Sequence, residues 1–101
     1  MTIPNVRVMG ITFEHVLTAL LDAIPVNGAV EGETLPVILL NPSARPPQQK
    51  LTSLHEVVHT MDDRLGIGLG EMKVRRVSAA LFQVLRDNPE WLDWIQEEGK
   101  P

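Results

Sequence analysis

Residues 55–59 read His-Glu-Val-Val-His, a pattern typical of a helix that holds a metal ion. An α-helix turns about 100° per residue, so residues four positions apart lie one turn apart on nearly the same face. His55 and His59 can therefore direct their imidazole rings at one ion, while Glu56 lies beside the place of a bound water. The alternative is a solvated helix face with two histidines by coincidence. The chain has only three histidines in total, which favours the metal-binding interpretation.

The sequence around this motif predicts a long amphipathic helix from about Pro47 to Leu65. Proline suits a helix start because the first amide of a helix needs no partner. Both histidines lie at the border of the apolar face, where the wall of a cleft is expected, and not at its centre. That apolar face is formed by Leu51, Leu54, Val57, Val58, Met61 and Leu65.

Length and composition limit the class of protein. The 101 residues are enough for one domain with one core, so we expect a single domain over residues 1–101. The absence of cysteine excludes thiolate ligands and disulfide bonds and fits a reducing cytoplasm. The net charge of −4, without a basic block, argues against a nucleic-acid partner. Without a signal-like segment or an apolar run near roughly 20 residues, we expect a cytoplasmic protein with no membrane partner.

The part of the chain before the metal helix predicts a small sheet. Residues 3–8 alternate weakly and indicate a short strand. Residues 11–24 are ambiguous, because the first half alternates like a strand and the second half has a helical composition. Residues 25–34 contain Asn-Gly and further glycines, which indicates a turn-rich connection. Residues 35–40 form the clearest strand, so the sequence predicts an α+β domain with about three strands followed by helices.

A catalytic zinc site usually has three protein ligands and one position for water, so a third ligand is needed. Asp63 continues the four-residue spacing, but eight residues of helix rise about 12 Å, which is too far for His55 and Asp63 to bind one ion. Asp62 meets nearly the same limit. We expect these aspartates to belong to a solvated charged face; the alternative is that one accepts a hydrogen bond from the outer nitrogen of a ligating histidine.

Glu71 is the better candidate for the third ligand. Glycines at positions 66, 68 and 70 predict a turn after the metal helix, and Glu71 then begins a second helix that runs to about Arg86. Glu71 shares the inward face of this helix with Val74 and Ser78, and an inward carboxylate needs a partner. A metal ion is one such partner, and an ion pair with Arg75 one turn later is the alternative.

The order of these features resembles that of small phage and prophage zinc metallopeptidases of the minimal gluzincin type. It is also similar to that of the ImmA/IrrE-type metallopeptidases, in which the His-Glu-x-x-His helix is followed by a glutamate that opens the next helix. The matching parts of this chain are residues 52–59, the glycine-rich turn, Glu71 with Val74, and the helix end at residues 85–89. The resemblance covers about residues 35–89.

This resemblance implies a zincin-like minimal metallopeptidase core with a bound Zn²⁺ and a peptide or protein substrate. His55, His59 and Glu71 would be the zinc ligands, and Glu56 would be the general base. The family architecture also implies an edge strand that lies above the metal helix and pairs with an extended substrate. The expected substrate-binding residues in that strand are Pro36, Val37, Ile38 and Leu39. We therefore expect a groove between this strand and the metal helix, with the metal at its floor.

One departure from many zinc peptidases concerns the oxyanion of the tetrahedral intermediate. Such enzymes often place a tyrosine or a histidine beside the metal to stabilise it, and this chain has no tyrosine. His15, Arg75 and Arg76 are candidates, and the sequence does not choose among them. For His15 we favour a half-buried, hydrogen-bonded position in the fold.

The C-terminal residues predict a short third helix. Asn88 suits the N-cap and Pro89 the first helical position. We expect this helix to close the core, and the alternative is an exposed partner-binding surface. Its apolar residues are Trp91, Leu92, Trp94 and Ile95.

Three functions follow from these patterns. The first is zinc-dependent hydrolysis of peptide bonds by a metal-activated water. The second is a non-catalytic regulatory or interaction module with a structural metal, and the third is a metal-free interaction protein that uses the C-terminal tryptophans. An open coordination position beside a groove favours the first function, whereas a fourth protein ligand favours the second. The sequence leaves the oligomeric state undetermined.

Overall fold

A computed structural model describes residues 3–18 and 36–97 of the chain. Within these ranges a three-stranded sheet precedes three helices, which confirms the predicted α+β class and the order of its elements. The turn-rich connection predicted at residues 25–34 and most of the helical half of residues 11–24 lie outside the described residues. The elements are β1 (Val6–Val8), β2 (Ile11–Leu17), β3 (Val37–Leu40), α1 (Pro46–Leu65), α2 (Gly70–Asp87) and α3 (Pro89–Gln96).

The sheet has the order β1-β2-β3. β1 and β2 form an antiparallel pair across the turn at Met9 and Gly10, both of which have positive φ. β3 is parallel to β2, with Ile38 opposite His15. In the described part of the chain β3 pairs with β2 alone and therefore forms an edge of the sheet.

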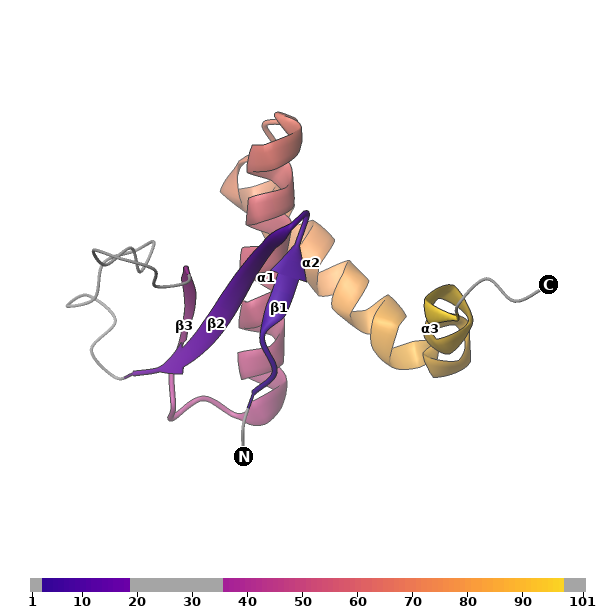
Figure 1. Ribbon diagram of the computed structural model, residues 1–101, viewed down its shortest axis with the longest axis horizontal. Coiled ribbons are helices and arrows are strands. Elements are labelled where there is room, and N and C mark those ends of the chain that lie inside the picture. The colour runs from indigo at the N-terminus through magenta and orange to yellow at the C-terminus, as the bar shows by residue number, and fades with distance from the viewer. Residues whose placement is uncertain (1–2, 19–35, 98–101) are drawn as a thin grey trace.

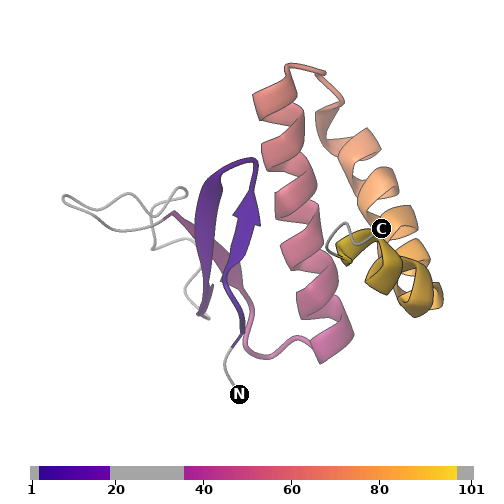
Figure 2. The same cartoon turned by 45° about the vertical axis from the view of Figure 1, so that its right-hand side comes forward.

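Helix α1 stands between the sheet and α2 (Figure 2). Its contacts with β1 and β3 cover one face of the sheet, and α2 packs on its other side. In β3 the period of two residues sends Ile38 and Leu40 to the same side, and both are buried. The core also includes Val8 from β1, Val58 from α1 and Val74 from α2.

The turn between α1 and α2 is built around Asp62. Gly66 ends α1 in the left-handed conformation at φ 66°, which glycine adopts without the strain of a side chain. The Asp62 carboxylate accepts the backbone N–H of Leu69 through both oxygens, at 3.0 and 3.2 Å. Asp62 is only 7% exposed. The predicted solvated face is therefore wrong at Asp62, although Asp63 and Arg64 are exposed.

Helix α3 extends from the end of α2, on the side away from the sheet (Figure 1). It contacts α2, but none of its residues is buried. Trp91, Trp94 and Ile95 are 46%, 66% and 50% exposed. The prediction that this helix closes the core is therefore wrong, because its contact with α2 leaves both tryptophans exposed and no residue of α3 buried. Among the described residues, no helix is long and apolar enough to cross a membrane.

The buried bond from Asp62 predicts a specific loss of stability. Replacement of Asp62 by alanine leaves the Leu69 N–H without its acceptor and should lower the free energy of unfolding by about 1–3 kcal/mol. Asp63→Ala, at the exposed neighbouring position, should change it by no more than about 0.5 kcal/mol. Urea unfolding followed by far-UV circular dichroism measures both. An equal loss in the two variants would contradict the role of Asp62 in the turn.

Candidate metal centre

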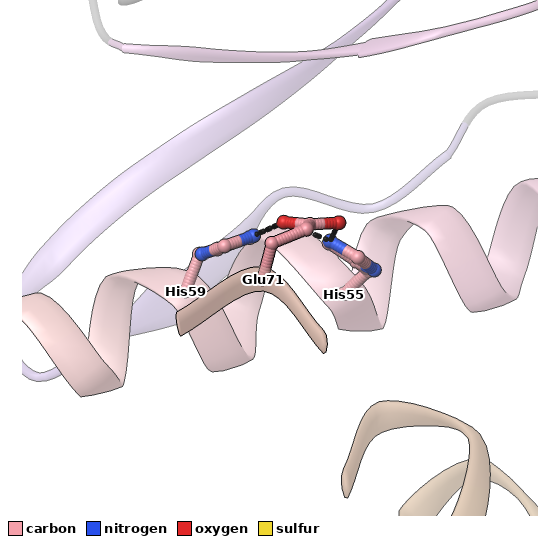
Figure 3. Close-up of side chains that lie close together, drawn as sticks. All are labelled: His55, His59 and Glu71. Atoms are coloured by element: carbon pink, nitrogen blue, oxygen red, sulfur yellow. Dashed lines mark hydrogen bonds and ion pairs between the residues drawn. The ribbon is translucent and has the colours of Figure 1, made fainter. Parts of the chain in front are cut away.

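His55 and His59 project from one face of α1 toward the first turn of α2, where Glu71 meets them (Figure 3). Oε1 of Glu71 lies 2.6 Å from Nε2 of His59. Nε2 of His55 lies 3.4 Å from the same Oε1, as a hydrogen bond, and 3.1 Å from Oε2. A carboxylate only accepts hydrogen bonds, so each histidine donates from a protonated Nε2 in this arrangement. The structure thus brings together the three residues predicted from the sequence as metal ligands.

His55, His59 and Glu71 fit a metal ion in the number of ligands, in their atom types and in the distances between their ligand atoms. One ligand atom from each residue can be chosen so that all lie within 4.8 Å of one another. Bonds of 2.0–2.2 Å in a tetrahedral site place neighbouring ligand atoms about 3.3 Å apart, so small side-chain movements suffice. Two imidazoles and one carboxylate are a ligand set of catalytic zinc sites, which keep a fourth position for water. An ion here would replace the two Nε2 protons.

Arg75 completes the surroundings of Glu71. Its Nε donates a hydrogen bond of 2.9 Å to Oε2 of Glu71, one helical turn away. This guanidinium, followed by the His59 ring, lowers the pKa of the Glu71 carboxyl from 4.5 to about 2. The sequence presented metal ligation and the Arg75 ion pair as alternatives for Glu71. In the structure, one carboxylate faces both histidines and Arg75 at once.

A cleft of about 490 Å³ opens beside the cluster, between α1 and α2. Glu56 is exposed and borders this cleft together with His55. Within the described part of the chain, no side chain donates a hydrogen bond to the Glu56 carboxylate, so it is available to a ligand. Polar cleft residues that sequence reasoning missed are Gln48, Thr52 and Ser78. Ser78 carried a signal, because a polar residue on the inward face of α2 needs a partner or a site; in the structure its hydroxyl donates a hydrogen bond of 2.6 Å to the backbone oxygen of Val74.

The expected groove between the strand and the metal helix, with the metal at its floor, is wrong for this cleft: the cleft is bounded by α1 and α2 residues, and the predicted substrate strand does not line it. The Ile38 side chain is buried in the core and faces no groove. Part of the β3 backbone, unlike the Ile38 side chain, is directed away from the core. Pro36 O and Leu40 O bond to β2, so alternation along the strand turns the N–H and C=O groups of Val37 and Leu39 to the outer edge.

Strand β3 ends on the side of α1 that carries Glu56. The Gln49 side chain donates a hydrogen bond of 3.0 Å to the backbone oxygen of Asn41, directly after β3. Gln49 and Glu56 are seven residues apart, which is two helical turns, and they therefore share one face of α1. The outer edge of β3 and the Glu56 side chain thus flank the same side of the metal helix.

His15 lies away from the cluster, as a half-buried and hydrogen-bonded residue, which confirms the interpretation favoured from the sequence. Its Nδ1 donates to Pro4 O at 3.0 Å, and its Nε2 lies 2.7 Å from Ser53 Oγ. Pro4 O can only accept, which requires the proton on Nδ1. The bond to Ser53 joins β2 to α1, so His15 serves the packing of the sheet on the helix.

Neither aspartate at the end of α1 supports the histidines. The Asp62 carboxylate bonds to Leu69 in the turn, and Asp63 makes no hydrogen bond to a histidine within the described chain. The alternative that one of them orients a ligating ring is therefore not realised.

Comparisons with protein-family models, with curated proteins and with solved structures find no match to this chain.

The lowered pKa of Glu71 predicts acid sensitivity in the metal-free protein. A carboxyl whose pKa falls from 4.5 to about 2 on folding contributes stability above about pH 4.5, and this is lost as the pH falls through about 2. Glu71→Gln should therefore flatten the fall of unfolding free energy between these limits, measured by denaturant titrations with a chelator present. Glu90→Gln, in the exposed first turn of α3, is the control. An unchanged slope in Glu71→Gln would contradict the ion-pair assignment.

Proposed function

We propose that this protein is a zinc-dependent metallopeptidase. The observation that carries the proposal is the convergence of His55, His59 and Glu71 on one point beside a cleft that Glu56 also borders. These are the parts that hydrolysis of a peptide bond requires: three ligands that leave a position for water, and a carboxylate next to that position. The resemblance in motif order to small phage and prophage metallopeptidases supports the same reading.

Each residue has a defined task in this proposal. His55, His59 and Glu71 hold the ion, which when bound lowers the pKa of a water molecule and polarises the scissile carbonyl. Glu56 accepts a proton from the attacking water and passes it to the leaving amine. Its exposed position suits this transfer, because a carboxylate without a partner among the described residues is free to reach both water and substrate.

The substrate is proposed to bind as an extended peptide along β3. The outward N–H and C=O groups of Val37 and Leu39 provide the pairing edge, which is the usual way a sheet edge takes up a peptide. Pro36 and Ile38 contribute to this role by fixing the strand, since Pro36 O pairs with β2 and the Ile38 side chain is buried. A peptide on this edge would run along the Glu56 side of α1.

The metal site predicts one divalent ion per chain. His55→Ala and His59→Ala should abolish zinc retention, and Glu71→Ala should weaken it, because each removes one ligand from the same ion. His15→Ala is the matched histidine control and should retain the ion. Metal analysis gives the stoichiometry, and addition of a chelator should lower the melting temperature of the wild type. Wild-type protein that stays metal-free in saturating zinc would refute the site.

The role of Glu56 predicts a variant that binds metal but does not turn over. Glu56→Gln should keep the ion and lose about 100-fold to 10,000-fold in hydrolysis of a denatured protein substrate such as casein. Glu90→Gln should keep both properties. Loss of zinc from Glu56→Gln as complete as from His59→Ala would identify Glu56 as a ligand instead.

A non-catalytic interaction module with a structural metal is the second candidate. The observation in its favour is the exposure of Trp91, Trp94 and Ile95 on α3, because large apolar side chains gathered on a surface often mark a contact site. The Glu56→Gln experiment separates the two functions. A module would retain zinc in the wild type and in the variant, and neither protein would hydrolyse a peptide.

A further inference from the structure

Peptide hydrolysis in this cleft needs a donor for the negative charge on the carbonyl oxygen of the tetrahedral intermediate. The chain has no tyrosine, which leaves His15, Arg75 and Arg76 as the candidates from the sequence. Their positions in the structure separate them.

His15 is excluded by its contacts. Both of its ring nitrogens are engaged, with Pro4 and with Ser53. Ser53 precedes His55 by two residues, which is about 200° of helix rotation, so His15 approaches the side of α1 away from the cluster. Arg76 is also excluded. It follows Arg75 by one residue, which turns its side chain about 100° around α2, and it does not line the cleft.

Arg75 lines the cleft together with Glu56 and His55. Its Nε donates to Oε2 of Glu71 at 2.9 Å, and the same oxygen lies 3.1 Å from Nε2 of His55. The Glu71 carboxylate therefore lies between the Arg75 guanidinium and the imidazole rings of the two histidines. Only Nε makes a hydrogen bond within the described chain, and the side chain is 72% exposed. The two Nη groups thus remain available to a ligand in the cleft.

We propose that Arg75 stabilises the oxyanion, an inference that rests on the proposed peptidase function. Glu71 holds the guanidinium in place, so its Nη donors need little reorganisation. When the water oxygen adds to the carbonyl carbon, the C=O π pair moves to the oxygen, and Arg75 donates hydrogen bonds to that charge. When the intermediate collapses, the pair re-forms C=O, the C–N bond breaks, and the amine leaves with the proton from Glu56. Arg75 stays protonated throughout.

The test compares the binding of two probes to zinc-loaded protein. One is tri-alanine, and the other is its analogue with a tetrahedral phosphinate in place of a peptide carbonyl. Arg75→Met should raise the Kd of the phosphinate by about 100-fold and leave that of tri-alanine unchanged, because only the phosphinate carries the charge of the intermediate. Arg75→Lys should recover part of the loss. Arg76→Met removes the same charge one residue away and should match the wild type. Calorimetry gives each Kd, and metal analysis confirms the zinc content.

The outcomes distinguish this inference from the function on which it rests. Wild-type protein that binds the phosphinate no more tightly than tri-alanine would overturn the peptidase proposal and the role of Arg75 together. A phosphinate Kd of zinc-loaded Arg75→Met that equals the wild-type value would overturn the role of Arg75 alone. Loss of zinc from Arg75→Met would show that Arg75 acts by positioning Glu71, which also overturns the oxyanion assignment.

Discussion

The hydrogen bonds that the Leu69 N–H donates to the buried Asp62 carboxylate fix the turn on which the site depends. They determine where α2 begins and hence which of its side chains face α1. A start displaced by one residue would rotate α2 by about 100° and carry Glu71 away from the histidines. The site therefore depends on a buried polar contact that touches none of its ligands. Gly66 contributes by ending α1 in a left-handed conformation that turns the chain back.

Charge explains how the three side chains assemble before an ion is bound. Glu71 sits among two protonated imidazole nitrogens and one guanidinium, so the carboxylate is stabilised in its charged form. A bound metal ion would take the place of the proton on Nε2 of each ring. The pairing with Arg75 leaves Oε1 of Glu71 directed at His59. The contacts of Glu71 with both histidines and Arg75 thus pre-organise the cluster.

The sheet supplies none of the proposed metal ligands, and its role is to pack against the metal helix α1. β2 is tied to α1 by His15 and Ser53, and the end of β3 is tied to it by Gln49. These two bonds set the sheet against the metal helix and orient the β3 edge toward the Glu56 side. Apolar packing of α1 on β1 and β3 holds the sheet in the same place, and α2 packs on the other side of α1. Helix α3 contacts α2, and its tryptophans lie exposed.

The sequence by itself determined the features that depend on local spacing. The four-residue interval between His55 and His59, the glycines of the turn and Glu71 at the start of the next helix together predicted the cluster, because helix geometry converts spacing into direction. Zinc and peptidase activity remain predictions. Only the tertiary structure decided the burial of Asp62, the hydrogen-bond partners of His15, the parallel pairing of β3 and the exposure of α3. The strand pairing and the His15 contacts join segments distant in the chain, the exposure of α3 depends on surface left uncovered, and the Asp62 bond depends on the exact path of a turn; none of these leaves a periodic signal in the sequence.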